Sequence, residues 1–113
     1  MIRLPAEMLR KPTPNCHHGR GQLETTVVID RSDELAPVPF MHDNIVPAGA
    51  SIGVHEHDHY EIYYVLEGAG TLIYDGQRND MPAGSVNVVE PGHSHGLENA
   101  GVAPMRLLVV GLP

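Results

Sequence analysis

Short apolar runs, separated at close intervals by glycine and proline, are the dominant pattern along this chain. Many of the runs are rich in β-branched or aromatic residues, which favour strands. The frequent glycines and prolines leave little room for long helices. The pattern predicts strands at residues 25–29, 40–46, 51–57, 61–67, 70–74, 77–81, 85–89, 95–99 and 105–110. Many short strands with regular turn signals are typical of an all-β sandwich or barrel.

The connections between these runs carry specific turn chemistry. Asp75-Gly76 separates two strand-like runs and is the signal for a two-residue type I′ hairpin, in which both central residues need positive φ. Pro47-Ala-Gly49, Pro82-Ala-Gly84 and Pro91-Gly92 each stand just before a new run. The turns therefore support a succession of short antiparallel strands.

The first part of the chain has a different character. Pro12 and Pro14 lie close together there, and Gly19-Arg-Gly21 follows them. These residues predict an extended N-terminal arm over residues 1–22, with a β-barrel over residues 23–113. A chain of 113 residues is long enough for one domain and too short for two.

Composition excludes several classes of function. The net charge of −7 would repel a phosphate backbone, so no nucleic-acid partner is expected. No run approaches the ~18 apolar residues of a membrane span, so no membrane partner is expected either. The one cysteine cannot form an internal disulfide, and no N-terminal signal is evident, so a cytoplasmic protein is the expectation.

Histidine is the unusual residue of this composition, with eight copies. Five of them form two clusters, one at residues 55–59 and one at residues 93–95. Because side chains alternate along a strand, His55 and His57 point to the same face and can grip one ion. Glu61 can add a carboxylate after a turn, and we expect His95 to come from a strand on the facing side of the barrel. Three imidazoles and one carboxylate suit one Mn, Fe, Co, Ni, Cu or Zn ion per chain.

Two segments resemble the conserved motifs of the cupin superfamily. The first motif is matched at every defined position by Gly49-x5-His55-x-His57-x3-Glu61-x6-Gly68. The second is matched by Gly84-x5-Glu90-x-Gly92-x2-His95-x3-Asn99, with Glu90 where cupins usually have proline. The general look of the chain is similar to small bacterial single-domain cupins that are labelled oxalate-decarboxylase-like. The resemblance implies an all-β, double-stranded β-helix (jelly-roll) barrel in which His55, His57, Glu61 and His95 converge on a metal.

Further residues are candidates for the ligand pocket. Alternation from Glu61 places Tyr63 on the same face, either as a proton donor to a bound substrate or as plain lining. His42 faces either the cavity or solvent, and Leu107 and Val109 on the last strand are expected to supply apolar walls. We therefore predict His42, Tyr63, Leu107 and Val109 as substrate-binding residues, with Tyr63 the candidate catalytic group.

The remaining polar residues have more than one interpretation each. His59 and His93 lie two residues from predicted ligands, so each is either a support for the site, a substitute ligand, or a separate surface residue. Glu90 either adds a carboxylate near the mouth of the site or is a solvated loop acid, and Arg106 either meets an anionic ligand or faces solvent. A second metal cluster at Cys16-His17-His18 is disfavoured, because three adjacent residues on an arm rarely close a site, and we expect His17 and His18 to take no part.

Two hypotheses for function remain open. The first is a small metalloenzyme, for example a decarboxylase, dioxygenase, isomerase or lyase, acting on a small oxygen-rich metabolite chelated at the metal. The alternative is a non-catalytic, metal-dependent binding protein for a small carboxylate or sugar. In both cases the partner is a small molecule that is anionic or polyhydroxylated. Exposed strand edges also predict a homodimer in which residues 1–30 cross over.

Overall fold

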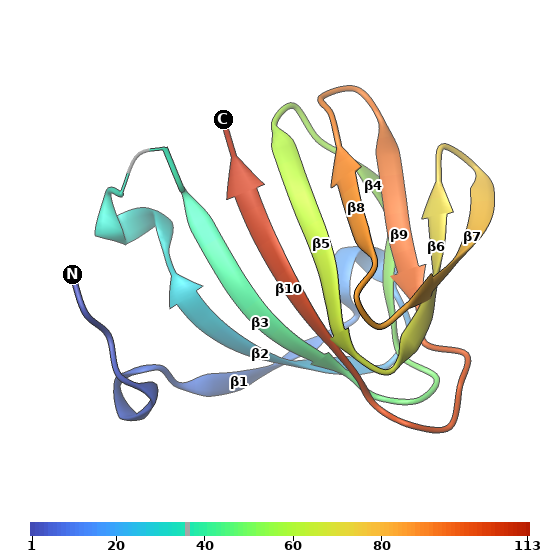
Figure 1. Cartoon of the computed structure of the whole chain (residues 1–113), viewed down its shortest axis with the longest axis horizontal. Helices are drawn as coiled ribbons and strands as arrows, with labels where there is room; N and C mark the ends of the chain where they lie inside the picture. Colours follow the sequence, from blue (N-terminus) through green and yellow to red (C-terminus); the bar gives the residue numbers. More distant parts are fainter. Residues whose placement is uncertain (36) are drawn as a thin grey trace.

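Ten antiparallel strands form two sheets in a computed structural model that describes residues 1–35 and 37–113 (Figure 1). The six-stranded sheet has the spatial order β1 (Arg10–Pro14), β2 (Gln22–Ile29), β3 (Phe40–Val46), β10 (Met105–Leu112), β5 (Tyr60–Glu67) and β8 (Val86–Val89). The four-stranded sheet has the order β4 (Ser51–Glu56), β9 (Ser94–Glu98), β6 (Ala69–Tyr74) and β7 (Gln77–Pro82). The arrangement is the jelly-roll barrel that the sequence predicts.

Every strand predicted from the pattern is present, and one further strand was missed. β1 contains Pro12 and Pro14, which cannot donate a hydrogen bond to a neighbouring strand. It lies at the edge of its sheet and pairs with β2, where prolines are tolerated. Part of the predicted N-terminal arm is therefore an edge strand of the six-stranded sheet.

Three short 3₁₀ turns accompany the strands: η1 (Pro5–Glu7), η2 (Cys16–His18) and η3 (Arg31–Asp33). Within the described residues, no helix is long and apolar enough to cross a membrane. The hairpin between β6 and β7 has the expected turn, since Asp75 and Gly76 both have positive φ, at 47° and 80°. The type I′ prediction is confirmed.

The hydrophobic core lies between the two sheets. Alternate residues of β10 point inward, among them Met105 and Leu107, which are both fully buried. Val65 of β5 and Leu97 of β9 meet them from the two sheets, and both are also fully buried. The core fills one end of the barrel, and polar residues of the same inward-facing rows gather beyond it.

Asn99, the last residue of the second motif, joins the two sheets at this core. Its side-chain amide donates to the carbonyl oxygens of Val46 at 2.9 Å and Ala103 at 2.8 Å. Its backbone N–H donates to the carbonyl of Ala50, and its own carbonyl accepts from the N–H of Gly49. With an exposed fraction of 2%, Asn99 is therefore a structural residue.

Candidate metal centre

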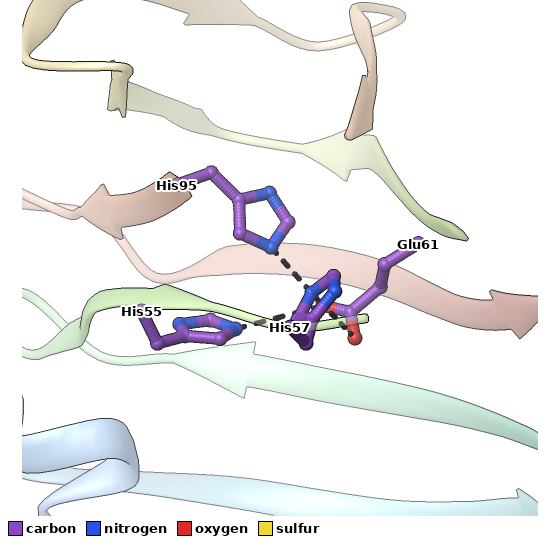
Figure 2. A group of neighbouring side chains, drawn as sticks. All are labelled: His55, His57, Glu61 and His95. Carbon is purple, nitrogen blue, oxygen red and sulfur yellow. Dashed lines mark hydrogen bonds and ion pairs between the residues drawn. The ribbon is translucent and has the colours of Figure 1, made fainter. Parts of the chain in front are cut away.

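The four residues predicted as metal ligands come together in the space between the sheets (Figure 2). His55 lies near the end of β4, His57 directly follows this strand, and Glu61 lies on β5. One ligand atom from each of the four residues lies within 4.8 Å of the others. His95 is on β9 directly opposite His55, because β9 pairs with β4. The expectation that His95 comes from a facing strand is thus wrong, and Glu61 is the residue from the other sheet.

The carboxylate of Glu61 is at the centre of the cluster. Its Oε1 lies 3.2 Å from Nε2 of His95 and 3.9 Å from Nε2 of His55. Its Oε2 lies 3.4 Å from Nε2 of His57. The side chain is almost fully buried, with an exposed fraction of 8%. All three imidazoles therefore direct the same nitrogen, Nε2, toward one carboxylate.

The opposite ring nitrogen, Nδ1, is held by a hydrogen-bond acceptor in each imidazole. Nδ1 of His55 donates to the carbonyl of Gly53 at 2.8 Å, and Nδ1 of His57 to the carbonyl of His59 at 3.0 Å. A carbonyl oxygen can only accept, so in these two rings the Nδ1 atom carries hydrogen and Nε2 has the lone pair when the ring is neutral. Supports of this kind fix both the tautomer and the orientation of metal-ligating histidines.

His95 is supported by a side chain instead of the backbone. Its Nδ1 lies 2.8 Å from Oδ1 of Asn87, which is 8% exposed and lies on β8. Asn87 therefore brings β8, after β5 the second strand of the six-stranded sheet at this site, into the support of the cluster.

The inward nitrogens also satisfy a direct test of fit to a metal. Nε2 of His55 and Nε2 of His57 are buried and have no hydrogen-bond partner among the described residues. Buried polar atoms normally have partners, and a cation would supply one to both of these lone pairs. The donor set of three imidazole nitrogens and one carboxylate suits a divalent transition metal ion.

The charges of the cluster are strongly coupled. Burial alone disfavours the charged form of Glu61, but the interactions with the imidazoles of His55 and His95 outweigh it and hold the pKa of this carboxyl far below its ordinary value. For His55, burial opposes the charged form, yet Glu61 and the Gly53 carbonyl raise the pKa overall. Burial lowers the pKa of His95. The cluster therefore holds a carboxylate that attracts a cation, either a proton on His55 or a metal ion.

Tyr63 lies beside the cluster and faces the same way as Glu61. It is 1% exposed, and its ring stacks on His95 with the centroids 4.0 Å apart. Burial, reinforced by the charge of Glu61, raises its pKa well above the ordinary value, so the phenol keeps its proton and can act as a hydrogen-bond donor. A catalytic role of Tyr63 stays a prediction.

Two neighbouring cavities adjoin the cluster, and both are bordered by Glu61. The outer pocket, about 380 Å³, contains His55, His57 and Glu61 together with residues from η3 and β3. The inner pocket, about 180 Å³, contains Glu61 and Tyr63. His42, a predicted pocket residue, lines both cavities. A larger groove of about 550 Å³ lies next to the outer pocket and contains none of the four clustered residues.

The two predicted apolar wall residues have different positions. Val109 lines the inner pocket, opposite Tyr63 in the pairing of β10 with β5. Leu107 is fully buried and belongs to the hydrophobic core, and it is not among the residues that line the two cavities. Both residues therefore point inward from β10, as predicted, but only Val109 borders a cavity.

The candidate accessory histidines divide into two groups. His59 lines the outer pocket, with its Nε2 3.5 Å from Oε2 of Glu61, and its ring stacks on His57. His93 instead forms an exposed ion pair with Asp75 at the hairpin, away from the cluster. Of these two residues, only His59 is placed to support the site.

The other polar candidates lie away from the cluster. Glu90 is exposed, and Arg106 donates to the carboxylate of Asp43 at 3.1 and 2.8 Å. Glu90 is therefore a solvated loop acid, and Arg106 is a partly exposed residue whose charge is paired with Asp43.

His17 was expected to take no part, and the structure corrects this expectation. Its ring stacks on His55 with the centroids 3.6 Å apart and the planes within 7° of parallel. It lines both pockets, and Cys16 lines the inner one. No spacing rule connects residue 17 with residue 55, because this contact depends on η2 packing against β4. The sequence carried no signal for it.

The fold and the cluster agree with the comparisons with known proteins. Residues 43–111 match the cupin domain family, and they make up more than half of the chain. The chain belongs to the cupin family. This match covers all four clustered residues.

Two of the comparisons show that this chain is similar to proteins of Thermotoga maritima. An oxalate-binding protein of that organism is 28% identical over 97% of this chain and 92% of its own length. A crystal structure from the same organism, described as a predicted oxalate decarboxylase, is 27% identical and covers 99% of this chain and 98% of that one, with a TM-score of 0.91.

The same fold also occurs in a polyketide cyclase. The polyketide cyclase RemF from Streptomyces resistomycificus is 21% identical to this chain, with a TM-score of 0.77, and covers 99% of this chain and 79% of its own. At this identity the likeness concerns the fold alone, so function must be argued from the site.

Proposed function

We propose that this cupin binds one divalent transition metal ion through His55, His57, Glu61 and His95, and captures a small carboxylate at that ion. One observation carries the proposal: three imidazoles are held at Nδ1 and direct Nε2 to one buried carboxylate. Because these side chains are already held in place, they lose little conformational entropy when an ion binds. The positive charge of the ion would also offset the cost of burying the Glu61 carboxylate.

The proposed ion is one of Mn, Fe, Co, Ni, Cu or Zn, the metals that mixed imidazole and carboxylate sites favour. When bound, it would supply positive charge that polarises the oxygens of a chelated ligand. Four protein ligands would leave one open position on a five-coordinate ion and two on a six-coordinate ion, and two are enough for a bidentate carboxylate.

Oxalate is the first ligand to test. The similar protein from Thermotoga maritima is an oxalate-binding protein, and the outer pocket of this chain offers space of about 380 Å³ beside the cluster. Arg31 lines that pocket, so an anion that reaches the cluster passes a guanidinium group.

A metalloenzyme is the second candidate, and a specific observation favours it. His42 and His59 line the outer pocket without belonging to the four-residue cluster, so imidazoles are available there for proton transfer. In this version Tyr63 donates a hydrogen bond, and the reaction is a decarboxylation, oxygenation, isomerisation or elimination. If a carboxylate incubated with the metal-loaded protein is converted to a different compound, the protein is an enzyme. If the carboxylate is recovered unchanged, the protein is a binding protein.

The metal and ligand assignments can be tested by calorimetry on protein purified without a histidine tag. We expect Mn²⁺ or Zn²⁺ to bind with one ion per chain, and oxalate to bind only to the metal-loaded protein. His57→Ala should lower metal affinity at least ~100-fold, because it removes a ligand. His93→Ala is the matched control, since His93 is exposed and bonded to Asp75, and should bind metal as the unmodified protein does. Stoichiometric metal in the His57→Ala protein would contradict the proposal.

We also propose that two copies of the chain form a homodimer through the N-terminal segment. β1 leaves one side free to pair as the edge of the six-stranded sheet in the described structure. The residues before it expose large apolar side chains, with exposed fractions of 86% for Ile2, 60% for Leu4 and 69% for Leu9. Apolar groups of this size next to a strand edge are typical of a surface that a partner covers.

A further inference from the structure

The inner pocket contains polar groups that the metal cluster does not use. It is a cavity of about 180 Å³ against the inward face of the six-stranded sheet, and it shares Glu61 and His42 with the outer pocket. Thr25, Asn44 and Tyr63 line it with exposed fractions of 8%, 5% and 1%. Because Glu61 borders both pockets, a ligand held at the cluster can reach a second compartment whose wall carries buried polar groups.

Asn44 is the residue in this compartment that most needs a ligand. It lies on β3 between Thr25 of β2 and Leu107 of β10. Its Oδ1 atom is buried and has no hydrogen-bond partner in the described part of the chain. An unpaired buried acceptor costs free energy, so a buried group without a protein partner calls for an explanation, of which a bound ligand is one. The amide is thus placed to bind a group that enters the pocket.

The neighbouring hydroxyl groups extend the same surface. Oγ1 of Thr25 and Oγ1 of Thr13 are 2.7 Å apart and share one hydrogen bond. Since each threonine has one hydroxyl hydrogen, the bond uses one of the two and leaves the other available. Thr13 belongs to β1, so the N-terminal strand contributes to this compartment.

The charge of the inner pocket selects the kind of group it can hold. Among the described residues that line it, none is lysine or arginine, whereas Glu61 contributes a carboxylate. A second carboxylate there would be buried beside a like charge without a counterion, which is strongly unfavourable. A hydroxyl is neutral, and because it both donates and accepts, it can pair with either atom of the Asn44 amide.

We propose that the inner pocket binds the hydroxyl-bearing end of a small hydroxycarboxylate whose carboxylate end is held at the metal cluster. Asn44 is then the specificity-determining residue, since it pairs with the hydroxyl of the ligand. The inference rests on the proposed function and narrows its ligand from carboxylates in general to those with an additional, non-chelating hydroxyl.

A matched pair of ligands tests this inference. Glycerate and lactate have the same 2-hydroxycarboxylate group for chelation, and glycerate has one further hydroxyl where lactate has only hydrogen. We expect calorimetry on the metal-loaded protein to give glycerate at least a tenfold higher affinity than lactate, because a hydrogen bond in a buried site commonly contributes that much. In Asn44→Leu, a variant of similar shape, the preference should disappear while lactate affinity and metal stoichiometry stay unchanged.

The outcomes separate this inference from the proposed function. Equal affinities for glycerate and lactate in the unmodified protein would overturn the inference and leave the metal-dependent capture of carboxylates intact. A glycerate preference that survives in folded Asn44→Leu would overturn the role of Asn44. If glycerate, lactate and oxalate all bind equally well without metal, the proposed function itself fails. Because the first comparison uses the unmodified protein, a folding defect in the variant cannot obscure it.

Discussion

The Nδ1 hydrogen bonds of the clustered histidines decide which nitrogen of each ring faces the centre. Alternation along a strand predicts that His55 and His57 share a face, but it does not distinguish Nδ1 from Nε2. That choice depends on the carbonyl of Gly53, the carbonyl of His59 and the amide of Asn87. The face to which a side chain points can be predicted from the alternation along a strand. The tautomer of a histidine depends on the hydrogen-bond partners around its ring, which only the folded structure supplies.

His55 leads to a prediction about pH. Its pKa in the metal-free protein is raised above 6.5, so below that raised value a proton occupies the ring and must leave before a metal binds. We expect metal affinity to fall about tenfold per pH unit as the pH decreases below the pKa of His55, and to level off above it. Titrations of Zn²⁺ between pH 5.5 and 8.5, in buffers of different ionisation enthalpy, would measure the released proton. An affinity that does not change across this range would contradict the prediction.

At the scale of elements, the segment around η2 is pressed against β4. A Cβ added at Gly53 would lie 1.9 Å from the carbonyl oxygen of His17, and one at Gly19 would lie 2.1 Å from that of Ser51. Ser51 is bonded through both its backbone N–H and its Oγ to the backbone of Arg20. This close approach, which only glycine permits, is what brings His17 onto the ring of His55.

The backbone of this segment is also strained. Asn15, His17 and His18 all have positive φ, a region that residues other than glycine seldom adopt. Strain of this kind persists where the surrounding structure enforces it, commonly at functional sites. The location of this strain next to a metal-ligand candidate supports a positioning role for η2.

Gly53→Ala tests the contact between η2 and β4. The added methyl group would collide with backbone, so we expect a loss of ~1–3 kcal/mol in the free energy of unfolding. Metal affinity should fall as well, because His17 can no longer stack on His55. Denaturant unfolding and calorimetry would measure the two effects.

Gly101→Ala is the matched control for this variant. A Cβ at Gly101 would make only an ordinary contact, 3.4 Å from Oδ1 of Asn99, so stability and metal affinity should be unchanged. A Gly53→Ala protein as stable as Gly101→Ala would show that η2 can move away from β4 without cost.

At the scale of the whole molecule, the two sheets bring distant parts of the chain to one place. β4 and β9 contribute His55 and His95 from one sheet, while β5 contributes Glu61 from the other. Neither sheet alone contains the full set, so the cluster depends on how the sheets pack. Loss of the core between them would separate Glu61 from its histidines and remove the candidate site.

The proposed homodimer can be tested at this scale by light scattering. We expect a mass of about twice the 12.3 kDa of the chain at micromolar concentration. Leu9→Lys should shift the protein toward a monomer, because it places a charge in the exposed apolar segment before β1. Val102→Lys, at a position that is 99% exposed in a different loop, is the control and should leave the mass unchanged. A monomeric mass for the unmodified protein would refute the dimer.

Much of this protein could be predicted from local features of its sequence. Turn residues such as Asp75-Gly76 and the alternation of apolar residues were sufficient for nine of the ten described strands. The spacing of His55, His57 and Glu61 was sufficient to name these three residues as candidate ligands within one short stretch of the chain. These features succeed because strand periodicity and turn conformation depend on residues adjacent in the chain.

The tertiary structure alone decided the surroundings of the site. β1 became a strand because β2 offers it a pairing edge, although its prolines argue against one. His95 proved to be the neighbour of His55 on a paired strand, and His17 its stacking partner from the N-terminal segment. Oδ1 of Asn44, which has no partner among the described residues, likewise becomes buried only once three strands pair around it. Contacts between residues far apart in sequence depend on sheet order and packing, which no local pattern encodes.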